Sequence, residues 1–234
     1  MRTGESLIQT ERVSKVRTEK QKDIHTAVGL IAAFALWTAA VRFADVQPIG
    51  PNGSAVGLAA INGFFHSFTG VHMTLYLLTD WFSLVPVGFA VGFAFLGLGQ
   101  WVKRKHLRNV DRSILVLGGF YIAVLAAYCF FEAVPVNYRP VLINGALEAS
   151  YPSSTTMLVL CVMPTAIAQL HTRIGSLRLR KCAAYAANTF MVLMVVGRLL
   201  SGVHWFTDII GGILLSAGLV KMYQAIAYSG QGRP

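Results

Sequence analysis

Residues 197–222 read GRLLSGVHWFTDIIGGILLSAGLVKM, in which a polar segment leads directly into an apolar run from Ile209 to Met222. Apolar runs of this kind recur along the chain, and a helix of about 20 mostly apolar residues can cross a bilayer. We predict six spans, at Thr26–Val41, Trp81–Trp101, Ile114–Phe131, Ser154–Leu170, Cys182–Val196 and Ile209–Met222. Several of these runs are shorter than a bilayer requires, so we expect their helices to extend into the flanking residues.

The composition of the whole chain supports the same interpretation. Hydrophobic residues make up 55% of the 234 residues and charged residues 13%, about half the charged share of a soluble domain. This composition argues against disorder and against a fibrous repeat. The three cysteines, Cys129, Cys161 and Cys182, lie in or beside apolar runs without metal-ligand spacing, and we interpret them as membrane-buried thiols. The predicted fold class is all-α, a polytopic membrane helical bundle with six transmembrane helices.

Residues 54–80 are harder to assign because polar side chains interrupt their apolar residues. The segment could form an amphipathic helix on the membrane surface, or it could lengthen the second span. We favour a surface helix near Val56–Phe65 and a second span that starts between His72 and Trp81. Asp80 fits an interfacial position, although acidic residues within a membrane are functional candidates by default.

The basic residues reveal the orientation of the spans. The formal net charge is +10, and 17 of the 20 Lys and Arg residues fall on one side of a six-span zigzag. The positive-inside rule places that side, with both termini, in the cytoplasm. The 17 residues are Arg2, Arg12, Lys15, Arg17, Lys20, Lys22, Lys103, Arg104, Lys105, Arg108, Arg112, Arg173, Arg178, Arg180, Lys181, Lys221 and Arg233. Because the positive charge is explained by topology, we expect no nucleic-acid partner.

We divide the chain into three parts: a cytoplasmic N-terminal segment (residues 1–25), a six-span membrane domain (26–225) and a cytoplasmic tail (226–234). The first part mixes both charges, and no small-residue cleavage site follows the first apolar run, so it does not resemble a secretory signal peptide. No internal repeat or linker indicates a second domain.

Three basic residues remain for the outer side: Arg42, Arg139 and Arg198. Arg139 lies in a loop that spans residues 132–140. Residues 151–156 (YPSSTT) open the fourth span, and a helix that starts at such a cluster presents free backbone N–H groups. Together with the helix dipole, these groups form a natural anion site.

His204 and Asp208 are four residues apart and would share one face of a helix. A carboxylate beside an imidazole fixes its tautomer and supports positive charge on the ring, which suits a nucleophile or a base. Two arginines nearby could bind a phosphate in bidentate fashion. The pattern therefore indicates phosphoryl transfer through a histidine nucleophile at the outer membrane–water boundary. On its own, an Arg-His-Asp cluster at a helix end is also typical of a structural network that anchors a loop.

These residues resemble the type 2 phosphatidic acid phosphatase superfamily of integral membrane lipid phosphatases, in its six-span form. That family carries the motifs Lys-x6-Arg-Pro, Pro-Ser-Gly-His and Ser-Arg-x5-His-x3-Asp. The third motif matches from Arg198 through His204 to Asp208, with Gly197 in place of the leading Ser. This motif is fairly specific because of its length and its charge pattern.

The other two motifs match in part. The first keeps its ending, Arg139-Pro140, but has Glu132 at the Lys position. The second keeps Pro152-Ser153 and then has Ser154 for Gly and Thr155 for His. The resemblance covers residues 132–208 in motifs, and the whole chain in span count and orientation.

The resemblance implies a role for each matching residue. His204 would attack phosphorus and form a phosphohistidine, and Asp208 would orient it. The phosphate oxygens would be held by Arg139, Arg198, Ser153, Ser154 and Thr155. The family's second-motif His protonates the leaving group, and Thr155 is too weak an acid to do so near neutral pH. Glu132 would repel a phosphate if its side chain pointed inward.

We therefore expect a metal-independent lipid phosphatase without a cofactor, in the plasma (cytoplasmic) membrane, with its site facing outside. Its substrates would be lipid phosphates or diphosphates, for example isoprenyl diphosphates. Diphosphates are favoured because the leaving phosphate departs without much help from an acid. His66 or His72 could supply the acid if their segment folds over the site, although both fit interfacial or loop positions. A lipid phosphotransferase and a catalytically silent lipid-phosphate binder remain as alternatives, and the oligomeric state is left open.

Overall fold

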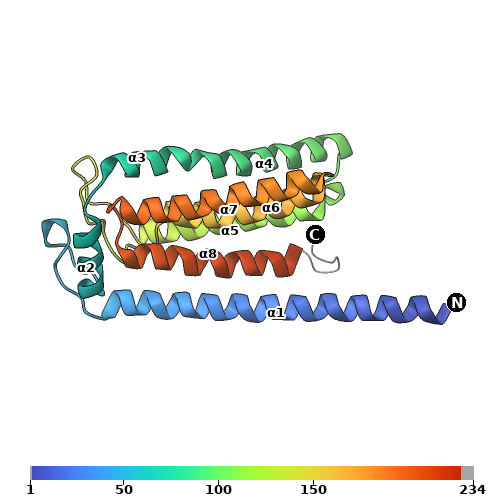
Figure 1. The fold of residues 1–234 in the computed structure, drawn as a ribbon, viewed down its shortest axis with the longest axis horizontal. Helices are drawn as coiled ribbons and strands as arrows, with labels where there is room; N and C mark the ends of the chain where they lie inside the picture. The colour runs from blue at the N-terminus through green and yellow to red at the C-terminus, as the bar shows by residue number, and fades with distance from the viewer. Residues whose placement is uncertain (1, 228–234) are drawn as a thin grey trace.

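The computed structural model describes the backbone of residues 2–227 and the side chains of residues 14–227. Figure 1 shows the long helices lying side by side, with α2 across one end of the bundle. The elements in chain order are α1 (Arg2–Phe43), η1 (Pro51–Gly53), α2 (Ala59–Thr69), α3 (Met73–Phe82), α4 (Leu84–Arg104), η2 (Leu107–Asn109), α5 (Arg112–Ala133), α6 (Ser154–Arg173), α7 (Leu177–Leu200) and α8 (Phe206–Ala227).

The described residues contain six segments that are long and apolar enough to cross a membrane. They are Ser14–Phe43, Met73–Arg104, Arg112–Ala133, Ser154–Arg173, Leu177–Leu200 and Phe206–Ala227. Each contains one of the predicted runs and extends beyond it, as the lengths required. The predicted fold class is therefore confirmed, and the chain is an integral membrane protein.

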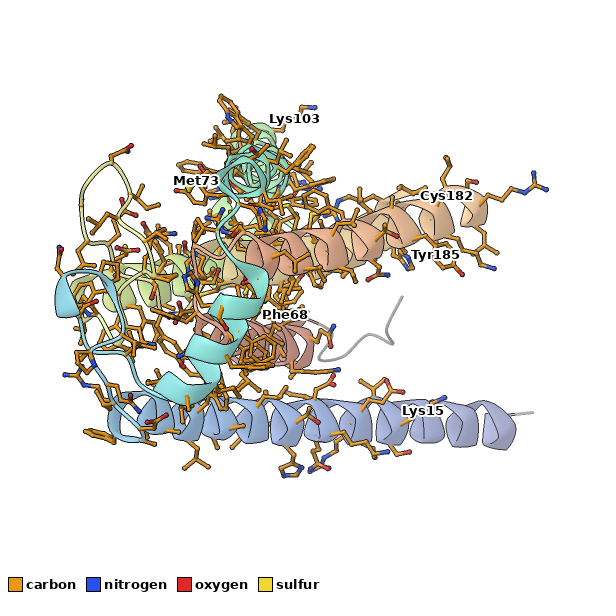
Figure 2. The ribbon with its side chains drawn as sticks, turned by 60° about the vertical axis from the view of Figure 1, so that its left-hand side comes forward. Lys15, Phe68, Met73, Lys103, Cys182 and Tyr185 are labelled. Atoms are coloured by element: carbon orange, nitrogen blue, oxygen red, sulfur yellow. The ribbon has the colours of Figure 1, made fainter. Side chains whose placement is uncertain are left out.

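The ambiguous region between the first two spans divides as predicted. The short helix α2 takes the place of the predicted surface helix, and it packs its buried Asn62 toward the bundle while Phe68 is exposed. Figure 2 shows α2 crossing the end of the bundle before the chain turns into α3 at Met73. The second span thus starts between His72 and Trp81, and α3 continues into α4 through Ser83.

The structure describes most of the N-terminal segment and only the start of the predicted tail. Residues 2–25, expected as a cytoplasmic segment, are helical and continuous with the first span. Of the predicted tail at 226–234, residues 228–234 lie outside the described residues. Figure 1 places the N-terminus at the end of the bundle opposite α2, where the loops that carry the predicted cytoplasmic cations also lie.

The core of the bundle is formed by α6 and α8. In an apolar stretch of 18 residues within each span, 56% of the residues are buried in α6 and 50% in α8, against 22% or less in each of the other spans. Small residues on α8 make this possible, because a Cβ at Gly218 would meet Ile31 of α1 at 2.7 Å, and one at Gly211 would meet the Tyr151 ring at 2.6 Å. Cys161 lies in this core, whereas Cys129 and Cys182 are exposed on the outside of the bundle.

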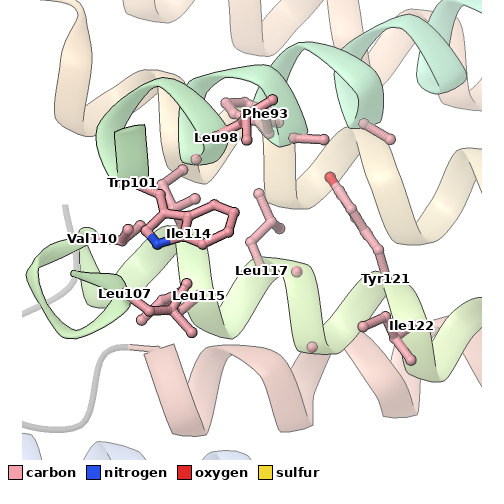
Figure 3. A pocket seen from close by; sticks show the side chains of 15 residues that line it. Phe93, Leu98, Trp101, Leu107, Val110, Ile114, Leu115, Leu117, Tyr121 and Ile122 are labelled. Atoms are coloured by element: carbon pink, nitrogen blue, oxygen red, sulfur yellow. The ribbon is translucent and has the colours of Figure 1, made fainter. Parts of the chain in front are cut away.

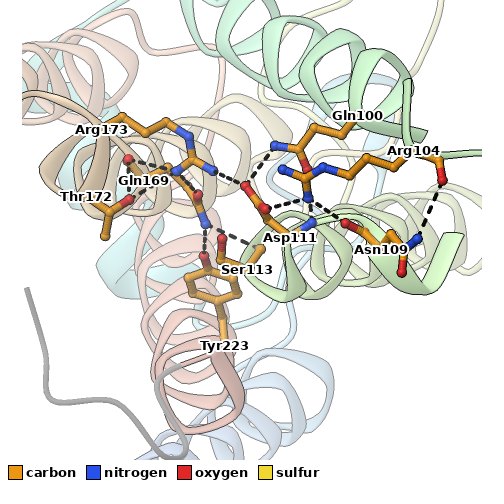
Figure 4. A network of polar contacts seen from close by, with 9 residues as sticks. All are labelled: Gln100, Arg104, Asn109, Asp111, Ser113, Gln169, Thr172, Arg173 and Tyr223. Carbon is orange, nitrogen blue, oxygen red and sulfur yellow. Dashed lines mark hydrogen bonds and ion pairs between the residues drawn. The ribbon is translucent and has the colours of Figure 1, made fainter. Parts of the chain in front are cut away.

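A polar network joins four helices at the end opposite α2 (Figure 4). Asp111 accepts hydrogen bonds from Gln100 Nε2 at 2.7 Å and from Arg104 Nη1 at 2.9 Å, and Arg173 Nη2 lies 3.9 Å away. Gln169 Nε2 donates to the Tyr223 hydroxyl at 2.8 Å, which extends the network to α8. The hydrogen bonds from Arg104 and Gln100 hold the pKa of Asp111 below its usual range.

An apolar cavity of about 540 Å³ lies beside this network, between α4 and α5 (Figure 3). Its walls include Phe93, Trp101 and Ile114, and Tyr121 brings one hydroxyl. A reaction on a phosphate needs charged or hydrogen-bonding groups, so this cavity is not the candidate site.

Candidate active site

The predicted site residues come together at the α2 end of the bundle. They lie in the α5–α6 loop, at the start of α6, near the end of α7, and at the start of α8. The seven residues are Arg139, Ser153, Ser154, Thr155, Arg198, His204 and Asp208. All except Ser154 are buried. Burying this many polar groups costs free energy, which points to a functional site or a tightly paired network.

His204 lies in the short loop before α8, and its side chain is 1% exposed. Its Nδ1 lies 3.1 Å from the carbonyl oxygen of Ser150. A carbonyl only accepts hydrogen bonds, so Nδ1 carries the proton and Nε2 keeps its lone pair. Nε2 faces Arg139 Nη1 at 3.3 Å. The ring is thereby fixed in the tautomer that can attack through Nε2.

Burial lowers the pKa of His204 well below its ordinary value, and the charges of Arg139 and Arg198 act in the same direction. The ring is therefore neutral near pH 7. A neutral imidazole has the free electron pair that a nucleophile needs.

Asp208 lies in the first turn of α8 and is fully buried. Its Oδ2 accepts the backbone N–H of Trp205 at 2.9 Å and lies 3.6 Å from His204 Nδ1. The predicted His204–Asp208 pairing is thus present, although His204 precedes the helix rather than sharing a helical face. The closer partner of Nδ1 is the Ser150 carbonyl, which the sequence pattern did not indicate.

Arg139 reaches the site from the α5–α6 loop. An antiparallel bridge between Tyr138 and Ala149 fixes this loop, and the Arg139 N–H donates to the Glu148 carbonyl at 3.0 Å. The Arg139 Nε also forms an ion pair with Glu148 Oε2 at 3.0 Å. The guanidinium is thus held by Glu148 through Nε, while its Nη1 faces His204 Nε2.

Arg198, in the last turns of α7, is held by α3. Its Nη1 donates to the Thr79 hydroxyl at 3.0 Å and to the Tyr76 carbonyl at 3.2 Å, and its Nη2 lies 3.5 Å from Asp80 Oδ1. The guanidinium carbon also lies 4.7 Å from the centre of the Tyr76 ring, within the range of a cation–π interaction. The second span therefore determines where this arginine points.

The close approach of α3 to α7 explains a departure from the family motif. A Cβ at Gly197 would lie 3.0 Å from Cγ2 of Thr79, so the leading Ser of the motif would crowd α3. Glycine at this position lets Thr79 come near enough to bond Arg198.

The first turn of α6 supplies the predicted anion site. Ser153 is the N-cap, and its Oγ accepts the Thr156 N–H at 3.5 Å, while its own N–H donates to the Asp208 carbonyl at 3.1 Å. Ser153 is therefore engaged in structure. Ser154 and Thr155 follow in the first turn, where backbone N–H groups have no partner within the helix.

Two cavities border this turn. A small one of about 10 Å³, the size of one water molecule, is lined by His204, Ser150, Ser154 and Glu132, among others. A larger one of about 400 Å³ lies between α4, α5 and α6, with Asp80, Ser154 and Thr155 among its lining residues. Ser154 borders both cavities.

The remaining candidates occupy different places. Glu132 lines the small cavity together with His204, where its charge would repel a phosphate. His66 lies 5.3 Å from the Trp205 ring, and His72 Nε2 is 2.9 Å from the Thr69 carbonyl oxygen; both cavities are lined by other residues. Within residues 14–227 we find no group of three or more His, Cys, Asp or Glu side chains that could hold a metal ion.

Several residues of the site were missed by the sequence analysis, or left unassigned. Ser150 acts through its backbone carbonyl, which no residue type signals. Tyr76 and Thr79 are separated from Arg198 by about 120 residues. Asp80 carried a signal, as an acid close to a membrane span, whereas Glu148 carried none.

The fold and the site together define a class: a polytopic helical membrane protein with a buried histidine that faces Arg139 and is influenced by the charge of Arg198. The model of the PAP2 superfamily matches residues 136–230, the segment that contains all seven predicted site residues. The resemblance to the type 2 phosphatidic acid phosphatase superfamily is thereby confirmed, and it supports a membrane lipid phosphatase.

One solved structure that is similar to this chain is described as "Crystal structure of the first transmembrane PAP2 type phosphatidylglycerolphosphate phosphatase from Bacillus subtilis". The sequence identity is 22%, the TM-score is 0.49, and the match covers 86% of this chain and 94% of that chain. No protein with curated annotation matches the sequence.

Proposed function

We propose that this protein is a membrane phosphatase that hydrolyses lipid phosphates or diphosphates through a phosphohistidine formed on His204. The observation that carries the proposal is the pairing of His204 Nδ1 with the Ser150 carbonyl, which leaves the Nε2 lone pair facing Arg139. A phosphate that engages Arg139 would free this electron pair for attack on phosphorus.

The reaction would proceed in two steps. Nε2 of His204 forms a bond to phosphorus while the bond from phosphorus to the leaving oxygen breaks. A water molecule then attacks the phosphohistidine, which releases phosphate and restores the neutral ring. During the first step the ring becomes positively charged, and the Asp208 carboxylate at 3.6 Å stabilises that charge.

The phosphate oxygens would be held by Arg139, Arg198 and the N–H groups of Ser154 and Thr155. Guanidinium groups bind phosphate oxygens in bidentate fashion, and the start of a helix adds backbone donors. Both arginines are ion-paired in the substrate-free protein, to Glu148 and Asp80. Phosphate binding therefore exchanges these carboxylates for phosphate oxygens. The two guanidinium groups would neutralise the phosphate charge without a metal ion.

The larger cavity suggests where the lipid lies. Its polar end carries Asp80, Ser154 and Thr155, and its remaining walls are mostly apolar side chains of α4–α6. A lipid chain in this cavity would bring its phosphate to the first turn of α6. We propose that the site faces outside the plasma membrane, because the basic loops lie at the opposite end of the bundle.

The test is phosphate release from a lipid diphosphate by the detergent-purified protein, in the presence of a chelator. We expect release by the wild type and none by His204→Ala. The same protein, rapidly quenched after mixing with ³²P-labelled substrate, should carry an acid-labile phosphoryl group. Transfer of the phosphoryl group to an added alcohol instead of water would favour a phosphotransferase. Substrate binding without release or transfer would favour a silent binder.

A further inference from the structure

The site contains a carboxylate that the two-step reaction has not yet used. The family's proton donor for the leaving group is replaced by Thr155, and an acid that substitutes for it would have to lie near that position. Two carboxylates border the cavities at the first turn of α6: Asp80 in the larger cavity and Glu132 in the smaller one. Their positions relative to His204 distinguish them.

Phosphoryl transfer places the attacking and leaving atoms roughly in line, on opposite sides of phosphorus. A proton donor to the leaving oxygen therefore belongs on the side of the phosphate that faces away from His204. Glu132 shares its cavity with His204, so it lies on the nucleophile's side. Asp80 lines the larger cavity together with Ser154 and Thr155, and His204 is not among the residues that line it.

We propose that Asp80 supplies the proton to the leaving group, in place of the histidine that Thr155 replaces. This inference rests on the proposed phosphatase function. Asp80 fits this role because it lines the same cavity as Thr155. Its Oδ1 also forms an ion pair with Arg198 Nη2 at 3.5 Å. A phosphate bound by Arg198 thus comes next to the Asp80 carboxyl group.

The charges around Asp80 change when substrate binds. In the free protein Arg198 is its cationic neighbour on α7, and Tyr121 and Tyr128 line the same cavity from α5. A phosphate that takes over Arg198 comes beside the Asp80 carboxyl group, whose side chain is 56% exposed.

The proton that Asp80 gives up in the first step is recovered in the second. In the first, the carboxyl proton moves to the leaving oxygen as the phosphorus–oxygen bond breaks and the bond to His204 Nε2 forms, which yields the lipid alcohol. In the second, the Asp80 carboxylate takes a proton from the attacking water. The oxygen of that water bonds to phosphorus, the phosphorus–nitrogen bond breaks, and Asp80 is protonated again.

The experiment compares Asp80→Asn with the wild type on a lipid monophosphate and the diphosphate of the same lipid. A lipid alcohol is a poor leaving group and needs the acid, whereas a phosphate leaves readily. We expect the variant to lose about 10²-fold or more in kcat on the monophosphate, and to stay within a few-fold of the wild type on the diphosphate. Asparagine can still accept a hydrogen bond from Arg198, which limits any change in substrate binding.

Two further variants sharpen the comparison. Introducing Thr155→His into Asp80→Asn should restore monophosphate turnover, because histidine then stands at the family's acid position. Asp45→Asn is the control for the loss of a carboxylate, because Asp45 is exposed in the loop before α2, where it accepts the Ala60 N–H at 2.7 Å, and it should turn over both substrates like the wild type. Each variant is first checked for an unchanged elution profile and helical content in detergent.

Other outcomes overturn the inference. Equal losses on both substrates would show that Asp80 only holds Arg198, and no loss on the monophosphate would show that it has no role. Wild-type hydrolysis of the diphosphate alone would mean that the site lacks an acid, while the phosphatase function stands. Absence of release from both substrates by the wild type would refute the phosphatase function itself, and this inference with it.

Discussion

Replacing Asp208 by asparagine separates two tasks that a carboxylate beside a histidine commonly performs together. In this site the Ser150 carbonyl already fixes the tautomer of His204, at 3.1 Å from Nδ1. Asparagine can still accept the Trp205 N–H that now bonds Asp208 at 2.9 Å. The substitution should therefore remove only the charge that stabilises the positively charged ring during attack.

The separation of the two groups gives the size of the effect. At the observed 3.6 Å and an effective dielectric constant of about 20, the attraction between the two charges is about 4.6 kcal/mol. At about 1.4 kcal/mol for each tenfold change, Asp208→Asn should lower kcat by about 10³. KM should change little, because the carboxylate faces the ring rather than the phosphate.

The assay is steady-state phosphate release from a lipid diphosphate, together with the rate of phosphohistidine formation after rapid mixing. Formation of the phosphohistidine should slow by the same factor as kcat. Asp45→Asn is the control, since Asp45 is exposed in the loop before α2, where its carboxylate accepts the Ala60 N–H, and it should leave both rates unchanged. A loss below tenfold, or a rise in KM at constant kcat, would refute the assignment of charge stabilisation to Asp208.

Three further predictions concern stability, packing and topology. The pKa of His204 is held below its ordinary 6.5 in the folded state. The unfolded state therefore binds more protons, and stability should fall as the pH drops below about 6.5. The unfolding temperature in detergent should show this decrease, and the His204→Asn variant should depend less on pH. Gly197→Ser should lower both the unfolding temperature and the activity, because the added Cβ would lie 3.0 Å from Thr79 Cγ2. Adding Thr79→Ser, which removes that methyl group, should recover part of both. Equal behaviour of the single and double variants would contradict the packing argument. Val46 and Leu107 lie at opposite ends of the bundle. In a background without the native cysteines, Val46→Cys should react with a membrane-impermeant maleimide added to intact cells, and Leu107→Cys should not. The reverse pattern would invert the proposed orientation.

The fold could be predicted from the sequence to a large extent because the bilayer imposes a simple requirement. Each span needs a long apolar run, and the six runs are visible without any contact information. The second span shows the limit of this approach, because α3 carries polar residues such as Thr79 and Asp80 that face α7. Only the packing of α3 against α7 explains why these residues belong to a membrane span.

The site could be predicted where spacing within one segment carries the signal. Arg198, His204 and Asp208 lie within eleven residues, so their pattern survives in the sequence. The Ser150 carbonyl could not be found this way, because every residue has one and only the fold determines which carbonyl meets Nδ1. The ion pairs of Arg139 and Arg198 with Glu148 and Asp80 likewise depend on tertiary contacts.

The length of the second span bears on how deep in the bilayer Arg198 would bind a phosphate. Met73–Arg104 has 32 residues, or about 48 Å of helix at about 1.5 Å per residue, against a hydrocarbon thickness of about 30 Å. Lys103 and Arg104 anchor one end at the water boundary, so the excess length projects at the other end, where Tyr76 and Thr79 hold Arg198. In the proposed orientation the arginine would stand at the level of the lipid headgroups. A phosphorylated lipid would then reach it by lateral diffusion in its own leaflet, without being lifted out of the membrane.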